Sequence, residues 1–286
     1  MQNIHTSGCE PGGAMALAAI AEAAAMATGV RGQRADRNAS RDAVIFALAK
    51  LAEQRDPETG AHLERVQRYC GILAHELAQS ERYREFISPE YIAAIIRSSP
   101  LHDIGKVGVP DSILLKPGRL TSEEFEVMKR HATIGGQTIQ ALIDQGRSQS
   151  YLRMGMEIAY AHHERWDGRG YPAGLSGEMI PLAARIVAVA DVYDALTSKR
   201  VYKPALSHID STALIMVERG RQFDPLIVDA FLVRAEEFDA IRRELADSAR
   251  APAAAAPRSA GRAVDVAARV PLFAAALPAG ATTTHA

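Results

Sequence analysis

Between residues 39 and 246, apolar side chains recur at every third or fourth position, and this spacing limits the fold more than any other feature of the sequence. The segment 61–80 is typical, with apolar residues at positions 63, 66, 69, 70, 73 and 77. That period lines one face of an α-helix, whereas a half-buried strand needs strict alternation. Convincing alternating runs are absent from the sequence. We therefore expect an all-α fold, with one domain of roughly seven to nine helices.

The composition changes twice along the chain. Residues 1–38 are rich in Ala and Gly, residues 39–246 have ordinary globular composition, and residues 247–286 are mainly Ala, Pro and Arg. A segment with few large apolar side chains cannot bury a core. We therefore expect one folded domain at 39–246 with flexible Ala-rich ends. The first of these ends is expected to be helical or disordered, and the last disordered.

Capping residues mark two of the expected helix starts. Thr121 and Glu124 have the spacing of a capping box, and Asp224 followed by Pro225 suits an N-cap and the first helical position. The segments expected to be helical are 40–56, 61–80, 89–106, 121–143, 150–167, 181–198, 210–220 and 223–245.

Charge, cysteine content and hydropathy exclude several roles. A net charge of −1 gives no bulk attraction to a nucleic acid polymer. The apolar run near the N-terminus is mostly alanine and carries Glu22, so it is too weakly hydrophobic for a membrane span, and no basic segment precedes it as in a secretory signal. With Cys9 and Cys70 as its only cysteines, the chain has no disulfide framework. We expect a cytoplasmic protein, with oligomerisation through the N-terminal segment left open.

His102 and Asp103 stand side by side in the stretch HDIGK, and both are metal-ligand types. Divalent metals need several such ligands from different elements, and the sequence offers further histidines and carboxylates inside expected helices. In particular, an aspartate within an apolar helix is costly to bury without a cation nearby. The candidate partners are Glu58, His62, His131, His162, His163 and Asp191.

Each candidate on its own has a structural explanation, such as a packed histidine or a first-turn acid facing the helix dipole. Together they are hard to explain by packing and predict a site for two or three metals. If the adjacent His162 and His163 are both helical, their side chains point about 100° apart, which suits two neighbouring metals better than one.

The motifs LHDIGKVGVPD, HHERWDGRGYP and DVYDALTSKRVYK, in this order, resemble the HD-GYP family. Members of that family are all-helical phosphodiesterases of the HD superfamily that hydrolyse the bacterial second messenger cyclic di-GMP. The resemblance covers about residues 40–240 and is strongest to the output domains of response regulators, although no receiver-like β/α pattern is present.

The resemblance implies a role for each motif residue. Asp103 would bridge two metals, and Glu58 stands where some family members carry a glutamate that recruits a third. Lys106, which the expected helix 89–106 places one turn from His102 on the same face, would contact substrate phosphate, as would Arg200 and Lys203. The exposed loop of Gly170, Tyr171 and Pro172 would contact partner proteins of the GGDEF type. The implied metal ligands are Glu58, His62, His102, Asp103, His131, His162, His163 and Asp191.

The activity implied by the resemblance is hydrolysis of cyclic di-GMP to pGpG, and to GMP if a second cleavage follows, by a hydroxide that bridges the metals. Imidazole and carboxylate ligands suit iron or manganese, and zinc or nickel stays open on ligand type alone. Two alternatives stay open. One is a catalytically weak cyclic-dinucleotide receptor or GGDEF-interaction module, and the other is a phosphodiesterase for a different cyclic dinucleotide.

Overall fold

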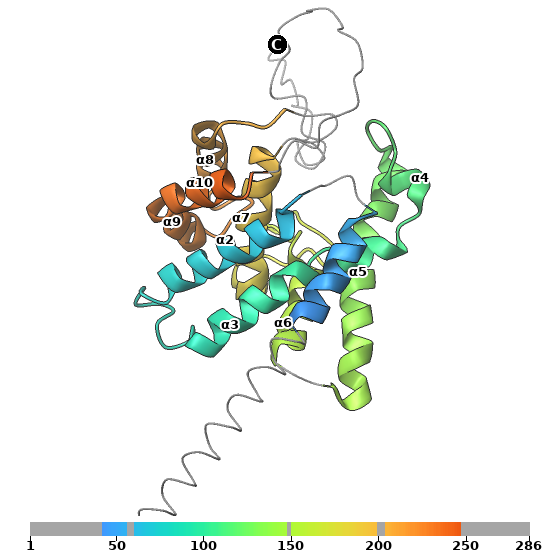
Figure 1. Cartoon of the computed structure of the whole chain (residues 1–286), viewed down its shortest axis with the longest axis horizontal. Helices are drawn as coiled ribbons and strands as arrows, with labels where there is room; N and C mark the ends of the chain where they lie inside the picture. Colours follow the sequence, from blue (N-terminus) through green and yellow to red (C-terminus); the bar gives the residue numbers. More distant parts are fainter. Residues whose placement is uncertain (1–41, 56–59, 148–149, 199–203, 247–286) are drawn as a thin grey trace, which may run out of the picture. The chain divides into compact units, whose positions relative to one another are not determined.

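The computed structural model describes the chain except for residues 1–41, 56–59, 148–149, 199–203 and 247–286 (Figure 1). The chain divides into two compact units, Met1–Ala47 and Leu48–Ala286. In the first unit the described residues, 42–47, are helical, and the second unit contains all the elements discussed below. The predictions for segments 1–38 and 247–286 lie outside the described residues, and the domain limits at 38 and 246 stay predictions.

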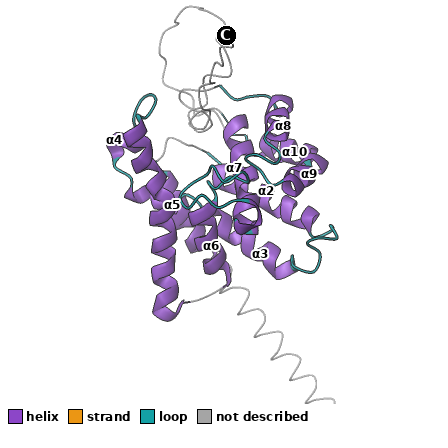
Figure 2. Cartoon of the chain, turned by 180° about the vertical axis from the view of Figure 1, so that it is seen from behind, coloured by secondary structure: helices purple, strands orange, loops and turns teal. Residues whose placement is uncertain are grey.

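The all-α prediction is confirmed. Within the described ranges the chain forms helices and turns, with one isolated β-bridge between Arg219 and Phe223 and no strand (Figure 2). Residues 42–53 are helical. The following helices are α2 (His62–Leu77), α3 (Pro89–Ser98), α4 (Asp111–Leu114), α5 (Ser122–Leu142), α6 (Ser150–Ala161), α7 (Leu182–Thr197), α8 (His208–Val217), α9 (Pro225–Val233) and α10 (Ala235–Glu244).

Both predicted helix starts are confirmed. The Thr121 hydroxyl accepts from the Glu124 amide at 3.2 Å, and the Glu124 carboxylate accepts from the Thr121 amide at 2.7 Å, which completes the capping box of α5. The Asp224 side chain caps α9 by accepting from the Leu226 amide at 2.8 Å. These bonds satisfy amides that the first helical turn leaves without partners.

Three expected helices end early. Segment 89–106 is α-helical only to Ser98 and continues as two short 3₁₀ helices, Ser99–Leu101 and Ile104–Gly108, because Pro100 has no amide to donate to the preceding turn. Segment 150–167 ends its helix at Ala161, and segment 223–245 breaks at Arg234 into α9 and α10. With the single turn of α4, the described residues therefore form ten α-helices rather than seven to nine.

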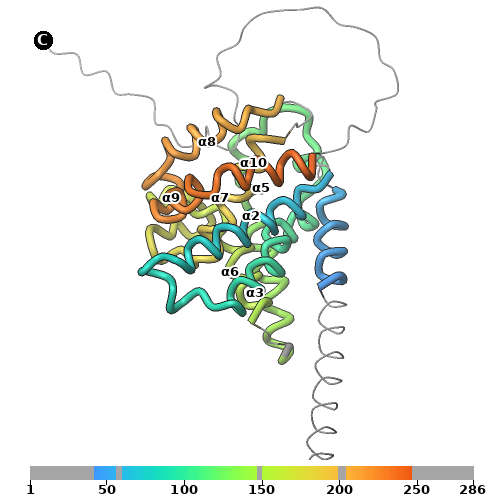
Figure 3. Tube along the Cα trace, turned by 60° about the vertical axis from the view of Figure 1, so that its left-hand side comes forward, coloured from blue at the N-terminus to red at the C-terminus, as the bar shows by residue number. Residues whose placement is uncertain are grey.

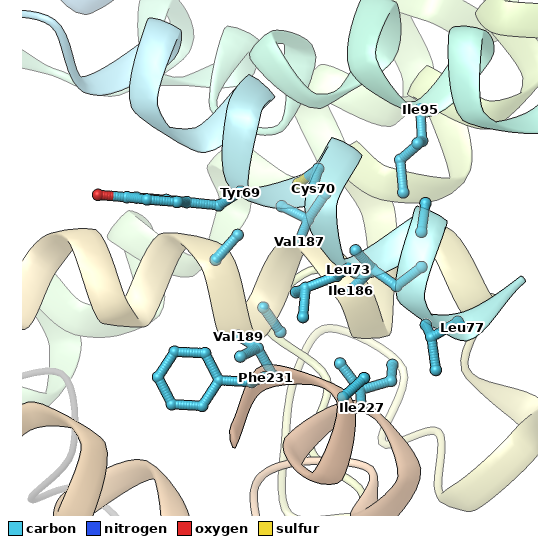
Figure 4. Packing of buried hydrophobic residues seen from close by; sticks show 14 of the residues in the cluster. Tyr69, Cys70, Leu73, Leu77, Ile95, Ile186, Val187, Val189, Ile227 and Phe231 are labelled. Carbon is cyan, nitrogen blue, oxygen red and sulfur yellow. The ribbon is translucent and has the colours of Figure 1, made fainter. Parts of the chain in front are cut away.

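Helix α7 is the centre of the core. Its own side chains are apolar on nearly all sides, and it is buried along most of its length. Helices α2, α6, α8 and α9 pack against it. Tyr69, Leu73, Ile186 and Phe231 are among the side chains that fill the space between these helices (Figure 4). Helix α10 packs along α2 (Figure 3). The core thus fixes α2 and α7, which both carry predicted site residues.

Among the described residues, none of the helices has both the length and the apolar character that crossing a bilayer requires.

Candidate metal centre

Five separate segments bring histidine and aspartate side chains together. His62 begins α2, His131 lies in the middle of α5, and Asp191 lies in α7. The other residues lie in turns: His102 and Asp103 between the two 3₁₀ helices, and His162 and His163 directly after α6. Apart from the two adjacent pairs, these residues are distant in sequence, so only the packing of the helices assembles them.

One group of potential ligand atoms comes from Asp103, His131, His162 and His163, all within 4.8 Å of one another. The Oδ1 atom of Asp103 lies 3.3 Å from Nε2 of His131 and 3.6 Å from Nε2 of His162. Three imidazoles and one carboxylate at this spacing are sufficient to hold a divalent metal ion.

A second group consists of His62, His102 and Asp191, again within 4.8 Å. The Oδ1 atom of Asp191 lies 3.8 Å from Nε2 of His62 and 3.9 Å from Nε2 of His102. The second carboxylate oxygen of Asp103 lies 3.3 Å from Nε2 of His102. Asp103 therefore stands between the two groups and offers one oxygen to each.

The hydrogen bonds around these residues fit a metal site. Nδ1 of His102, His131 and His162 donates to the backbone carbonyl oxygens of Ser99, Met128 and Ile158, respectively. That bond leaves the Nε2 lone pair of each ring directed into the cluster. These three Nε2 atoms and Oδ1 of Asp103 are buried and have no hydrogen-bond partner in the protein. Since buried polar atoms are normally paired, a bound cation explains their arrangement.

The electrostatics of the first group favour the ligand forms of its side chains. Burial lowers the pKa of His131 to about 4, and burial together with His162 and His131 lowers the pKa of His163 well below its usual value. Both imidazoles are therefore neutral near pH 7. Burial alone would raise the pKa of Asp103, but Lys106 and His102 outweigh it and hold this pKa well below its usual range. The carboxylate is thus ionised.

The structure corrects the expectation for the adjacent histidines. His162 and His163 were expected on a helix, facing two different metals, but both belong to the group that contains Asp103 and His131. The helix ends at Ala161, and in the turn that follows the two rings lie with their centroids 4.0 Å apart. The angle of about 100° between adjacent side chains of a helix therefore does not apply to His162 and His163. The remaining ligand candidate, Glu58, lies outside the described residues.

Lys106 lies beside the cluster, but not where the helical expectation put it. It belongs to the 3₁₀ helix Ile104–Gly108, and its ammonium group is 2.7 Å from Oδ2 of Asp103 rather than one α-turn from His102. The turn packs tightly on α5, because a Cβ atom at Gly105 would lie 2.0 Å from the carbonyl oxygen of His131. Glycine at this position is what lets Lys106 approach the cluster.

A small pocket opens next to Lys106. It is lined by Ala49, Glu53, His62, Leu63, Pro100, His102, Asp103 and Lys106. Two ligand candidates of the second group, His62 and His102, therefore line this pocket together with the Lys106 cation. The other predicted phosphate contacts, Arg200 and Lys203, lie outside the described residues.

Asp194 is a site residue that the sequence analysis missed. It lies one helical turn after Asp191, is almost fully buried, and accepts a hydrogen bond from Nδ1 of His62 at 2.8 Å. Arg65, also buried, donates to the same carboxylate at 2.5 and 3.0 Å. A carboxylate behind a ligating histidine orients the ring and increases its basicity. The available signal was a second acidic residue in the apolar run DVYDAL.

The GYP loop is anchored beside the first group. The buried Glu164 carboxylate accepts from the amides of Ala173 and Leu175 at 2.7 and 3.0 Å. Gly170 lies so close to this segment that a Cβ atom there would be 2.3 Å from the Arg165 amide nitrogen. As a result the Tyr171 ring packs on His163, with centroids 4.8 Å apart, while Pro172 is exposed.

Comparison with known proteins agrees with this arrangement. A model of the HD domain family matches residues 47–227. A cyclic di-GMP phosphodiesterase of Vibrio cholerae is 52% identical over 210 residues, which cover 73% of this chain and 43% of the relative. The cyclic di-GMP phosphodiesterase response regulator RpfG of Xanthomonas campestris is 47% identical over 188 residues, which cover 66% of this chain and 46% of the relative.

A third relative is named for a different substrate. The 3′3′-cGAMP-specific phosphodiesterase 2 of Vibrio cholerae is 40% identical over 204 residues, which cover 71% of this chain and 37% of the relative. The chain thus spans less than half the length of each of these curated relatives. With the family match over most of its described residues and with its HD and GYP motifs, the chain belongs to the HD-GYP family of HD-domain proteins.

Proposed function

We propose that this chain is a metal-dependent phosphodiesterase that hydrolyses cyclic di-GMP to pGpG, and to GMP where a second cleavage follows. The observation that carries the proposal is the position of Asp103 between two groups of ligand atoms, with Lys106 at its side. The 52% identical relative named for this activity supports the substrate class. We assign the activity to the predicted domain, residues 39–246.

The proposed metal ligands are His62, His102, Asp103, His131, His162, His163 and Asp191, and Glu58 is proposed as the ligand of a third ion. Divalent ions held there would lower the pKa of a bound water and neutralise the phosphoryl oxygens of the substrate. Mixed imidazole and carboxylate ligation favours iron or manganese. The neutral imidazoles of His131 and His163 and the ionised carboxylate of Asp103 are in the forms that bind such ions near pH 7.

Lys106 has the clearest role among the protein cations. Its side chain is 14% exposed and lines the pocket, where the ammonium group can bind a non-bridging phosphate oxygen. Charge stabilisation by a fixed cation is strongest where negative charge develops in the transition state. Its ion pair with Asp103 holds it in place before the substrate arrives. We propose Arg200 and Lys203 as further phosphate contacts.

Hydrolysis of another cyclic dinucleotide is the second candidate function. It is favoured by the relative at 40% identity, which is named for 3′3′-cGAMP. A receptor with negligible catalysis is less favoured, because each described ligand position holds a metal-binding side chain. A contact with a GGDEF-type protein would use the exposed residues 172–174, since Tyr171 packs inward on His163.

A cytoplasmic location is part of the proposal and fits the free, buried thiol of Cys70. Self-association is a further element of the proposal that sedimentation of the purified chain would test.

The first experiment measures turnover and metal content on one sample. Protein purified without oxygen and loaded with Fe(II) or Mn(II) is given cyclic di-GMP, 3′3′-cGAMP or cyclic di-AMP, and the products are separated by chromatography. We expect pGpG or GMP from cyclic di-GMP at two or more metals per chain. Metal-loaded protein that leaves cyclic di-GMP intact would contradict the first proposal, and cleavage of 3′3′-cGAMP alone would establish the second.

Two variants separate metal binding from phosphate contact. Asp103→Ala should lose metal and turnover together, because it removes the carboxylate between the two groups. Lys106→Ala should keep its metal and lose turnover. Asp229→Asn, in an exposed ion pair with Arg219, is the matched control and should behave like the parent protein. Full activity in the Asp103→Ala protein would refute the assigned site.

A further inference from the structure

We propose that Arg55 is a positioning residue for the reaction, because it holds the turn that presents Lys106 to the substrate. The catalytic role of Arg55 rests on the proposed function. Its contacts with the turn do not depend on that function. Arg55 follows the helical residues 42–53 and lies 51 positions before Lys106 in the chain.

The guanidinium of Arg55 binds the turn mainly through backbone carbonyl groups. One terminal nitrogen donates to the carbonyl oxygens of Lys106, at 3.4 Å, and Val107. The other donates to the carbonyl oxygen of Val109, at 3.2 Å, and to the Asp111 carboxylate, at 2.6 Å. A single side chain therefore spans the second half of the 3₁₀ helix Ile104–Gly108 and the residues that follow it.

Helix α5 also contacts this turn. Gly105 lies directly against the backbone of His131, and Gly108 lies against the side chain of Ile134, which a Cβ atom would approach to 3.0 Å. The turn is thus held by contacts with both α5 and Arg55. A five-residue 3₁₀ helix has too few internal hydrogen bonds to keep one conformation by itself, so these flanking contacts fix the backbone that carries Lys106.

The chemistry of arginine explains the residue type. Its planar group carries five N–H donors in a fixed arrangement and can bind several carbonyl oxygens at once, which a lysine ammonium at the end of a flexible chain cannot do with the same geometry. The ion pair with Asp111 adds little, because that carboxylate side chain is 68% exposed. The carbonyl contacts are therefore the part that positions the turn.

The test compares Arg55→Gln, Arg55→Lys and the control Arg68→Gln, each also measured for metal content. Arg68 on α2 forms an exposed pair with Glu244 on α10 and should leave turnover unchanged. Arg55→Gln should retain its metal and lose about 10- to 100-fold in kcat, since small misplacements of a catalytic group have effects of this size. The kcat of Arg55→Lys should lie between that of Arg55→Gln and that of the Arg68→Gln control.

A double variant identifies the route of the effect. If Arg55 acts through Lys106, then adding Arg55→Gln to Lys106→Ala should change turnover by less than about twofold, because the two changes remove one interaction. Effects that multiply in the double variant would overturn the inference, as would an Arg55→Gln protein with parental turnover. Loss of metal in Arg55→Gln would also overturn it, since Arg55 would then act on the metal ligands.

Amide hydrogen exchange provides a readout that does not need the reaction. In Arg55→Gln, exchange should increase in residues 104–109 and stay unchanged in α7, while Arg68→Gln should alter neither. If the parent protein cleaves no cyclic dinucleotide but this exchange pattern appears, the proposed function fails and the positioning contact stands. Unchanged exchange in 104–109 refutes the contact whatever the activity.

Discussion

Replacing Asp194 by asparagine should weaken both the fold and one metal position. The carboxylate accepts from His62 at 2.8 Å and from Arg65 at 2.5 and 3.0 Å, and Arg65 is only 3% exposed. Removing one charge of a buried pair leaves the other without compensation, at a cost of about 3–5 kcal/mol. We expect about 3 kcal/mol for the asparagine variant, because its amide oxygen can still accept from Arg65.

The same change should affect metal binding through His62. An asparagine amide cannot anchor the Nδ1–H group of His62 as a carboxylate does, and loss of such a partner typically lowers metal affinity about 10- to 100-fold. His102, His131 and His162 rely on backbone carbonyl oxygens and should be unaffected. We therefore expect one metal to be lost in a chelator titration before the other.

Two measurements check this reasoning. Urea unfolding of metal-free protein gives the change in the free energy of unfolding, and metal titration followed by elemental analysis gives the affinities. Asp229→Asn breaks an exposed pair with Arg219 and should cost less than about 1 kcal/mol. If Asp194→Asn is as stable as that control, or keeps both metals with parental affinity, the assigned role of Asp194 is wrong.

Two further predictions concern the GYP loop and the protonation of the cluster. Gly170→Ala should cost about 1–3 kcal/mol by overpacking, because its Cβ meets backbone atoms of Glu164 and Arg165, whereas Gly71→Ala meets only the side chain of Ile96 and should cost less in thermal unfolding. In metal-free protein, His131 contributes stability that is fully present above its unfolded pKa of about 6.5 and is lost as the pH falls through its folded pKa of about 4. His131→Gln should therefore flatten the pH dependence of the free energy of unfolding between these values, and an unchanged slope would contradict the buried, neutral state of this ring.

Local chemistry was enough to predict the helical class of the fold and two of the helix starts. The apolar period of α2 and α5, the Thr121–Glu124 capping box and the Asp224–Pro225 start each depend on residues within one or two turns of one another. The ligand candidates could likewise be chosen by residue type. A histidine or carboxylate inside an apolar helix needs a partner whatever the fold, and that requirement is visible in the sequence.

Contacts between segments distant in sequence decided how the site residues are grouped and which residues orient them. His62 and Asp194 are 132 positions apart, and Arg55 and Lys106 are 51 apart, so no local rule relates them. The sequence by itself determined that the chain is helical and which histidines and carboxylates are candidates for a metal site. Only the tertiary structure decided that His162 and His163 share one group and which partner orients each ligand, because the packing of α2, α5 and α7 sets distances that helical periodicity does not contain.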